Sequence, residues 1–310
     1  MGPDEPAHVT PFKTNLIEGA KPVRCKARQY TKEQSDFLFE FTNLLKQFGL
    51  IYENYNAEWA SPVQVVKKEK GFRMVADLRA GNAQSEPTAW PMPFLESIVQ
   101  YLSSSKMWFI LDAFKGFWIM PLDESCQEIF SFMTDRAIFT PTRSIQGASN
   151  SAIQFQARMT QIFAELLYKS LIIWIDDLLG HADTEEKWFS VLSRTLELAD
   201  AFSLKFNIDK CHFFLRQVKF CGRIFRAGGV IHDPSRVEAL TNMPIPTKAN
   251  ELQQILMASQ WMSRSIPNYN SIVLPLQDIF EMAMKNQPPR TKKQLVVCIF
   301  NILAGMILIQ

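Results

Sequence analysis

Three aspartates are the side chains of this sequence best suited to chemistry. Asp112 ends the apolar run 108–111, and Asp176-Asp177 directly follow the apolar run 171–175. Two Mg²⁺ ions acting on a phosphate need several hard oxygen ligands on a rigid support, which strand ends supply. An Asp-Asp pair is also common in structural turns, because aspartate bonds nearby backbone amides. The apolar frame favours a metal site, since adjacent carboxylates repel each other unless a cation relieves them, but it does not exclude a turn.

Short strands between amphipathic helices must position these aspartates. Apolar runs predict a strand at 108–111 and a tight hairpin in which 171–175 and 178–179 flank the acidic pair. Apolar residues at helical spacing predict helices at 152–168 and 185–204. Mixed helices and antiparallel hairpins indicate an α+β fold rather than a doubly wound parallel sheet.

The preceding part of the sequence predicts a helix followed by a hairpin. Thr31 and Gln34 fit a capping box, and β-branched, alternating residues further on indicate strands. The expected elements are a helix from Thr31 to a stop at Gly49, strands at 61–66 and 72–76 joined by the charged turn 67–71, and a helix at 94–102.

Both flanks differ from this central part. Residues 1–28 are polar and contain four prolines, which predicts an extended lead-in. After residue 234 the composition predicts a helical subdomain, with Asn250 as N-cap of a helix at 251–263. The apolar run 295–309 covers 15 positions. Because a helix needs roughly 20 residues to span a bilayer, no membrane anchor is expected.

Composition fits an ordered intracellular protein. The 47% hydrophobic content excludes a mainly disordered chain. Five cysteines without a CxxC pair argue against structural zinc, and the start lacks a signal-peptide pattern, so a cytoplasmic or nuclear, not secreted, protein is expected. Residues 176–199 hold six acids and two bases, and residues 200–248 hold eight bases and four acids. That order suits a metal site beside a phosphate-backbone track, although solvated helix faces give similar imbalances.

An ordered series of segments also resembles one known family. It is similar to the fingers and palm, and then to the thumb and the start of the connection, of gypsy-type LTR retrotransposon and retroviral reverse transcriptases. From Lys285 onward the resemblance stops, which suggests a truncated element copy. The segments are SPVQVVKKEKGFRMVADLRAGN (61–82), FILDAFKGFWIMPL (109–122), QGASNSAIQFQ (146–156), WIDDLL (174–179), LKFNIDKCHFF (204–214), VKFCGRIF (218–225), VIHDPSRVEAL (230–240), IPTKANELQQILMASQWMSRSIPNYN (245–270) and VLPLQDIF (273–280).

The resemblance implies a right-hand polymerase of α+β class, with fingers, a palm of antiparallel sheet plus helices, and a partial helical thumb. The implied division is an extended lead-in at 1–28, fingers at 29–90, palm at 91–121, a fingers/palm loop at 122–150, palm at 151–229, thumb and start of the connection at 230–285, and an apolar tail outside the resemblance at 286–310.

The implied activity is RNA-directed DNA synthesis, in which deoxynucleoside triphosphates extend a primer 3′-hydroxyl on an RNA or DNA template. Asp112 matches the first palm carboxylate, and Asp176-Asp177 match the pair of the aromatic-x-Asp-Asp signature. These residues would bind two Mg²⁺ ions, with Mn²⁺ as a substitute. Catalysis would rest on positioning and charge neutralisation rather than on a covalent intermediate.

Other positions match residues that handle the nucleotide. Lys68 and Arg73 match the basic residues that contact the triphosphate, although basic turns are usually only solvated. Phe117 matches the aromatic residue that crowds the sugar 2′ position, and a core position explains it equally well. Gln146-Gly147 matches the loop that touches nucleotide and template, where glycine permits close backbone approach; a simple loop is the alternative.

The last matches concern the leaving group and the primer. Lys210 stands where a lysine can protonate pyrophosphate, but a surface lysine is as simple an explanation. Phe220-Cys221-Gly222 matches the hairpin that grips the primer end, and core packing is the stronger interpretation for Phe220. Three departures put nucleotide handling or activity level in question: Trp174 for the usual Tyr or Phe, Gly81 for Leu, and Ala152 for Pro.

Three functions therefore stay open. The first is an RNA-directed DNA polymerase. The second is a decayed or domesticated fragment that binds template-primer without copying it. The third is a metal-dependent nuclease that uses the same acids, and it leaves the basic hairpin and the Gln146-Gly147 loop unexplained. The sequence does not indicate an oligomeric state.

Overall fold

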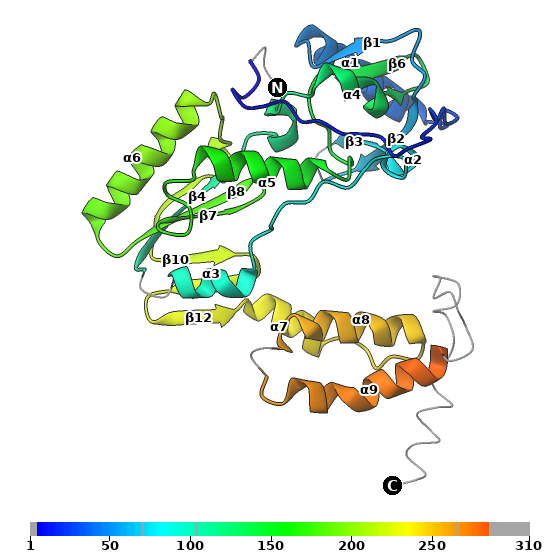
Figure 1. Cartoon of the computed structure of the whole chain (residues 1–310). Helices are drawn as coiled ribbons and strands as arrows, with labels where there is room; N and C mark the ends of the chain where they lie inside the picture. Colours follow the sequence, from blue (N-terminus) through cyan, green and yellow to red (C-terminus); the bar gives the residue numbers. More distant parts are fainter. Residues whose placement is uncertain (1–4, 70, 103–104, 264–265, 285–310) are drawn as a thin grey trace. The chain divides into compact units, whose positions relative to one another are not determined.

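The computed structural model describes residues 5–69, 71–102, 105–263 and 266–284 (Figure 1). The chain divides into two compact units, Met1–Val230 and Ile231–Gln310. The apolar run predicted at 295–309 lies outside the described residues. Within the described ranges, no helix combines the length and the apolar character that crossing a membrane requires.

Helix α1 (Lys32–Gln47) begins at the predicted capping box. The Gln34 amide donates to the Thr31 hydroxyl at 3.3 Å, and the Gln34 side chain accepts from the Thr31 amide at 3.1 Å. Leu38 and Leu45 are fully buried on the inner face. Gly49 adopts a φ of 65°, the left-handed conformation that commonly follows a helix, so the predicted stop is confirmed.

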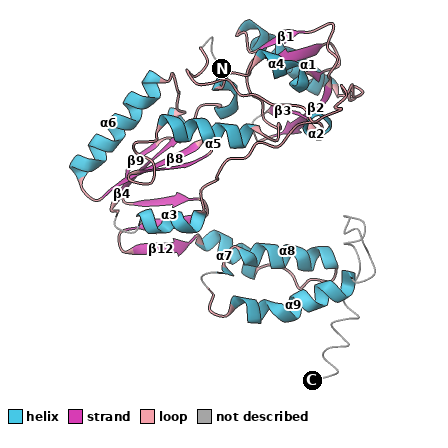
Figure 2. Cartoon of the chain, viewed as in Figure 1, coloured by secondary structure: helices cyan, strands magenta, loops and turns pink. Residues whose placement is uncertain are grey.

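A five-stranded sheet with strand order β1-β6-β5-β2-β3 lies beside α1 (Figure 2). The pairing of β2 with β3 is antiparallel, from Val63 opposite Ala76 to Lys67 opposite Phe72, so the predicted hairpin is confirmed. The strands are β1 (Ile51–Glu53), β2 (Ser61–Lys67), β3 (Phe72–Ala76), β5 (Phe132–Met133) and β6 (Ile138–Pro141).

A second sheet carries the aspartates and has the order β7-β8-β4-β9. Its strands are β4 (Met107–Asp112), β7 (Leu171–Trp174), β8 (Asp177–Ala182) and β9 (His212–Leu215). On one face Phe109 packs against Trp188 of α6 (Glu185–Ala201), with ring centroids 5.9 Å apart. On the other face Trp108 clusters with Ile98 of α3 (Leu95–Leu102). Both faces of the sheet are therefore covered at β4, whereas the outer strand β9 is largely exposed.

The predicted helices at 152–168 and 185–204 exist but are shorter. Helix α5 (Ser151–Ile162) gives way to turns in which the Leu166 carbonyl accepts from the Ser170 and Leu171 amides. Helix α6 begins at its N-cap Thr184 and ends at Ala201, just before Ser203, which has a φ of 53°. Apolar residues continue at helical spacing beyond both ends because they pack into the core from turns.

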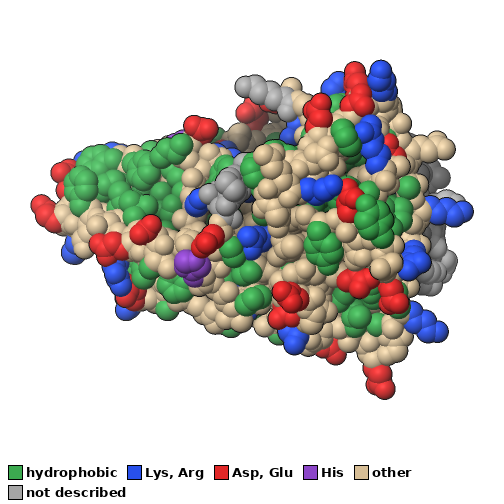
Figure 3. Space-filling view, turned by 90° about the horizontal axis from the view of Figure 1, so that it is seen from above, with side chains coloured by type: hydrophobic (Ala, Val, Ile, Leu, Met, Phe, Trp, Pro, Cys, Tyr) green, Lys and Arg blue, Asp and Glu red, His purple; other side chains and the backbone are tan. Residues whose placement is uncertain are grey.

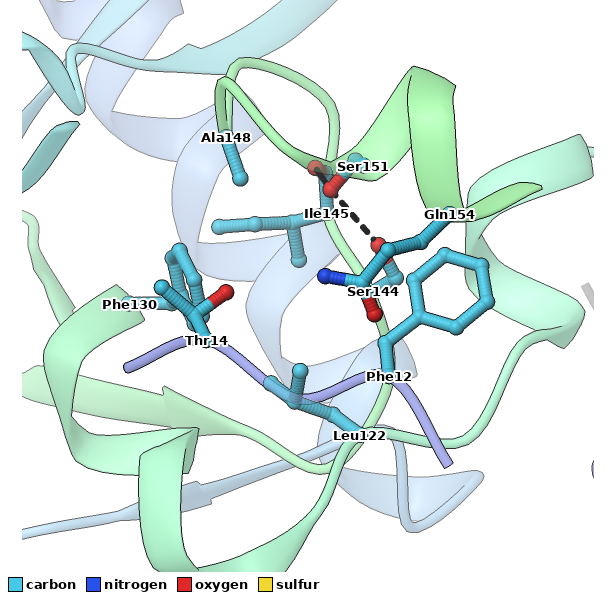
Figure 4. Close-up of a pocket in the computed structure, with 9 residues that line it drawn as sticks. All are labelled: Phe12, Thr14, Leu122, Phe130, Ser144, Ile145, Ala148, Ser151 and Gln154. Carbon is cyan, nitrogen blue, oxygen red and sulfur yellow. Dashed lines mark hydrogen bonds between the residues drawn. The ribbon is translucent and has the colours of Figure 1, made fainter. Parts of the chain in front are cut away.

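The described part of the N-terminal segment, residues 5–28, contains neither helix nor strand, in agreement with the predicted extended lead-in, and it is also part of the core. Phe12 is 2% exposed and bridges to Leu122. The Gln154 side chain of α5 accepts from the Lys13 amide at 2.9 Å and donates to the Lys13 carbonyl at 2.7 Å. Phe12 also helps to close a cavity of about 10 Å³, roughly the size of one water molecule (Figure 4).

Short elements complete the first unit and lead into the second. They are α2 (Arg79–Asn82), η1 (Gly116–Ile119), α4 (Glu124–Gln127), η2 (Glu128–Phe130), η3 (Ile208–Lys210) and a three-stranded sheet of β10 (Gln217–Phe220), β11 (Arg223–Arg226) and β12 (Gly229–His232).

The second unit contains α7 (Pro234–Thr241), α8 (Ala249–Gln260) and α9 (Tyr269–Met284), so a helical composition is confirmed for its described part. Ala249 and Leu252 of α8 cluster with Ile279 and other residues of α9. The predicted N-cap Asn250 is wrong, because α8 starts one residue earlier and Lys248 is its N-cap.

Helix α6 leaves apolar side chains uncovered on its outer surface. Phe189 is 60% exposed and Leu196 is 43% exposed. In Figure 3, hydrophobic side chains gather at the left, the side on which Figure 1 places α6. The amphipathic pattern of α6 is therefore broader than the stripe that it buries against the sheet.

Close packing in the second sheet predicts a strict requirement for Gly180. A Cβ atom at Gly180 would lie 1.9 Å from the ring of Phe109, its cross-strand partner. We expect Gly180→Ala to lower the free energy of unfolding by about 3 kcal/mol, measured by urea denaturation. Gly81→Ala is the control, because its Cβ would lie 3.4 Å from the nearest atom; an equal loss in both variants would contradict the prediction.

Burial of His181 predicts acid sensitivity. Its Nδ1 lies 2.8 Å from the Ser105 hydroxyl, and burial lowers the pKa of its imidazole from 6.5 to about 4. The unfolded chain thus takes up a proton that the folded chain does not, so stability present above pH 6.5 falls as the pH drops toward 4, by about 3 kcal/mol at most. Thermal melts from pH 7 to pH 4 should show this loss, and His181→Gln should flatten it. The same substitution at the exposed His8 should not.

Candidate active site

The two sheet strands bring the predicted aspartates together. Asp112, the last residue of β4, pairs directly with Asp177, the first residue of β8. Asp176 lies in the two-residue turn that joins β7 to β8, and its carbonyl accepts from the Ala113 amide at 2.9 Å. Ile175, the other turn residue, has a φ of 55°, which is rare for a β-branched side chain. The strand-end position predicted from the sequence is therefore confirmed, and the turn that forms it is strained.

Lys210 provides the positive charge closest to these carboxylates. Its Nζ atom lies 2.9 Å and 3.2 Å from the two oxygens of Asp112, and this hydrogen bonding raises the pKa of the lysine. Burial, followed by the charges of Asp176 and Asp112, raises the pKa of Asp177 to about 6. One ammonium thus faces three carboxylates, and their repulsion is only partly compensated.

The donor chemistry of this group fits a divalent cation. Carboxylate oxygens are the ligands that Mg²⁺ and Mn²⁺ prefer, and the charges of Asp176 and Asp112 add to burial in raising the pKa of Asp177. Among the residues that the structure describes, no three His, Cys, Asp or Glu side chains are already gathered as a metal-binding group. The ligands are therefore present, but they are not assembled around a common point.

A cavity of about 490 Å³ opens beside the carboxylates. It brings together candidate residues from distant parts of the sequence. Its lining includes Lys68, Arg73, Asp112, Phe117, Gln146, Asp176 and Lys210. The other candidates, Asp177, Gly147, Phe220, Cys221 and Gly222, are not among the lining residues. The cavity therefore has an acidic side at the strand ends and a basic side at the β2–β3 hairpin.

The basic side has an aromatic wall that sequence analysis missed. Arg73 pairs with Val66 across the β2–β3 hairpin. Phe37 of α1 stacks on Phe41 with ring centroids 5.5 Å apart, and it lies 5.6 Å from the ring of Phe72. These rings line the same cavity. Phe37 belongs to the apolar pattern of α1, but nothing in that pattern distinguishes a core side from a cavity wall.

The Gln146-Gly147 loop passes close to the end of β3. Gly147 has a φ of 111°, and a Cβ atom there would lie 3.0 Å from the Ala76 carbonyl oxygen. Asn82 fixes the loop, because its amide donates to the Gly147 carbonyl at 2.9 Å and accepts from the Ser149 amide at 3.0 Å. Only glycine fits this position without strain. Asn82 was not singled out, although it lies in a matching segment.

Phe117 and the β10–β11 turn are the remaining candidates, and they lie in different surroundings. The Phe117 ring lines the cavity and also packs edge-on against Phe155 of α5, with centroids 5.6 Å apart. Phe220 is 4% exposed and packs under α3, so its side chain serves the core. Cys221 and Gly222 form the two-residue turn between β10 and β11, with φ angles of 47° and 80° that suit a type I′ hairpin.

Comparison with known proteins gives the family. The model of the family described as "Reverse transcriptase (RNA-dependent DNA polymerase)" matches residues 65–225, just over half of the chain. The chain belongs to this family. The match includes both strands that carry the aspartates, the basic hairpin from Val65 onward and the Gln146-Gly147 loop.

The relatives of this reverse transcriptase chain include retrotransposon polyproteins, as the sequence resemblance implied. The Retrovirus-related Pol polyprotein from transposon 297 of Drosophila melanogaster is 30% identical over 76% of this chain and 23% of its own length. That from transposon opus of the same species is 27% identical over 83% of this chain and 26% of its own length. The Transposon Tf2-3 polyprotein of Schizosaccharomyces pombe is 24% identical over 80% of this chain and 19% of its own length. The chain thus spans about a quarter or less of these relatives.

Solved structures confirm the α+β reverse transcriptase fold. The foamy viral protease-reverse transcriptase dRH in complex with double-stranded DNA matches with a TM-score of 0.81 and 19% identity, covering 97% of this chain and 52% of that one. The foamy viral protease-reverse transcriptase in complex with an RNA/DNA hybrid matches with a TM-score of 0.76 and 20% identity, covering 97% of this chain and 40% of that one. At these identities the likeness concerns the fold.

Proposed function

We propose that this reverse transcriptase chain is an RNA-directed DNA polymerase that transfers deoxynucleotides to a primer 3′-hydroxyl. The observation that carries the proposal is the cavity that joins Asp112 and Asp176 to the basic hairpin residues Lys68 and Arg73. A nucleoside triphosphate needs positive charge at its phosphates and metal-binding carboxylates at the reacting phosphorus. The solved relatives bound to double-stranded DNA and to an RNA/DNA hybrid support a template-primer as partner.

The proposed chemistry divides the cavity between a metal side and a phosphate side. Asp112, Asp176 and Asp177 would hold two Mg²⁺ ions, or Mn²⁺ in their place, and the bound ions would neutralise the phosphate and align the attacking hydroxyl. Lys68 and Arg73 bind the triphosphate as donors. Lys68 and Arg73 also orient the substrate, and together with the cavity walls they exclude water from the reacting group.

The other candidates complete the site. Phe117 sets the sugar preference by filling the space beside the 2′ carbon, and Gln146-Gly147 contacts the nucleotide and the template. Lys210 donates a proton to the pyrophosphate leaving group. The turn at Phe220-Cys221-Gly222 holds the primer end, and its tight geometry gives a rigid edge for that contact.

One observation favours a second candidate function, binding of template-primer without synthesis. Lys210 contacts both oxygens of Asp112, and the carboxylates are not gathered as a metal site in the described part of the chain. A lysine that held Asp112 in the presence of substrate would block metal binding there. The departures at Trp174, Gly81 and Ala152 agree with a decayed site.

Primer extension separates the two functions. On an RNA template with Mg²⁺ the wild-type chain should extend a labelled DNA primer, and Asp112→Asn or Asp176→Asn should lower the rate at least about 1,000-fold, because each removes a charged ligand. Asp200→Asn on exposed α6 is the control and should retain full activity. Tight duplex binding by a wild-type chain that makes no product would establish the second function instead.

A sugar-selection assay tests Phe117. Phe117→Val should raise the incorporation of ribonucleotides relative to deoxynucleotides about tenfold or more, because the smaller side chain leaves room for a 2′-hydroxyl. Phe114→Val is a matched control, since Phe114 lines the same cavity three residues earlier. An unchanged ratio in Phe117→Val, measured in single-nucleotide competition, would assign Phe117 to core packing alone.

A further inference from the structure

The turn that carries Asp176 is held by a side chain from another element. Gln156 of α5 is 1% exposed. Its Oε1 accepts from the Ile175 amide at 2.7 Å, and its Nε2 donates to the Ile173 carbonyl at 3.2 Å. Both ends of the amide are therefore used, one on each side of Trp174.

The position of β7 explains why this contact is needed. β7 is an outer strand of the sheet β7-β8-β4-β9, so β8 is its one neighbouring strand in the described sheet, and a single bridge from Leu167 to Leu171 adds pairing only at its start. The backbone groups of Ile173 and Ile175 that bond Gln156 have no neighbouring strand within the described sheet to bond instead. Gln156 takes the place that a further strand would fill. Buried backbone groups without such a partner are costly.

The contact also opposes the strain in the turn. Ile175 has a φ of 55°, a conformation that a β-branched residue adopts only when its surroundings enforce it. The 2.7 Å bond to Gln156 is made by the amide of this same residue. Asp176 is the next residue, so the direction of its backbone depends on how firmly Ile175 is held.

We propose that Gln156 is a positioning residue that fixes the Asp176 carboxylate for metal binding. The inference rests on the proposed function, because it assigns the metal role to Asp176. A glutamine is required, since one group must donate to a carbonyl and accept from an amide 19 residues later in the chain. The two hydrogen bonds of Gln156 to Ile173 and Ile175 are called the clamp below. Loss of the clamp leaves the fold but lets the turn relax, and the Asp176 carboxylate then binds the cation less tightly.

The chain offers a matched control on the same helix. Gln154 is also buried and makes the same two bonds, accepting from the Lys13 amide and donating to the Lys13 carbonyl. Gln154→Met and Gln156→Met thus remove equivalent hydrogen bonds, one pair at the N-terminal segment and the other at the aspartate turn. A difference between them isolates the effect on the turn from the general loss of a buried amide.

Mn²⁺ binding, followed by electron paramagnetic resonance on the purified full chain, is the main test. Gln156→Met should weaken Mn²⁺ affinity about tenfold, and Gln154→Met should leave it within about twofold of wild type. Hydrogen exchange at the Ile175 amide should accelerate only in Gln156→Met. In primer extension, kcat should fall about tenfold while the KM for the nucleotide stays within about twofold.

The outcomes separate this inference from the proposed function. Equal Mn²⁺ affinity in the two glutamine variants, or a wild-type chain that binds no Mn²⁺, overturns the clamp. A wild-type chain that binds Mn²⁺ in a Gln156-dependent way but extends no primer supports the clamp and overturns the polymerase. If Gln156→Met folds poorly, Gln156→Asn keeps the amide but shortens the side chain by one methylene, so that it no longer reaches both backbone groups, and weakened Mn²⁺ binding is again expected.

Discussion

The antiparallel pairing of β4 with β8 places Asp112 beside Asp177 in the candidate site and sets where the turn that carries Asp176 begins. Six residue pairs join the strands, from Met107 opposite Ala182 to Asp112 opposite Asp177. Both faces of this pair are buried, one under α6 and the other under α3. A shift of one residue would turn every side chain to the opposite face, so packing excludes other registers. The carboxylates are adjacent because the apolar residues behind them have only one acceptable alignment.

This alignment places like charges side by side, and the fold tolerates the resulting repulsion. Burial and two neighbouring carboxylates oppose the ionisation of Asp177, and they raise its pKa to about 6. The Lys210 ammonium neutralises part of the charge of Asp112, and because the lysine side chain is exposed it can move away from Asp112 without disturbing the core. Sites that bind cations commonly keep such uncompensated charge. The stability of the surrounding sheet, including the tight fit of Phe109 over Gly180, is what permits it.

Sequence patterns predicted the elements that depend on local chemistry. The capping box at Thr31, the β2–β3 hairpin and the strand that ends at Asp112 follow from neighbouring residues, and they were found as expected. Helix ends were less predictable, because residues 163–168 keep a helical apolar spacing while packing from turns. The core role of Phe12 was also missed. Its partners are more than 100 residues away, and no local pattern marks such contacts.

The candidate site shows the same division between local and distant causes. Asp112 and Asp176 are visible as acids at the ends of apolar runs, but their support is not, because Gln156 looks like any polar residue in an amphipathic helix.

Three consecutive residues of α5 make this clear. Gln154 holds the N-terminal segment, Phe155 packs against Phe117, and Gln156 holds the turn before Asp176. Successive residues of a helix point about 100° apart, so a helix with packed neighbours on several sides can contact three of them in one turn. The same helix therefore supports Phe117 at the cavity and the turn that carries Asp176. A displacement of α5 would move both together, which couples the position of Phe117, the proposed sugar-selecting residue, to that of the proposed metal ligand Asp176.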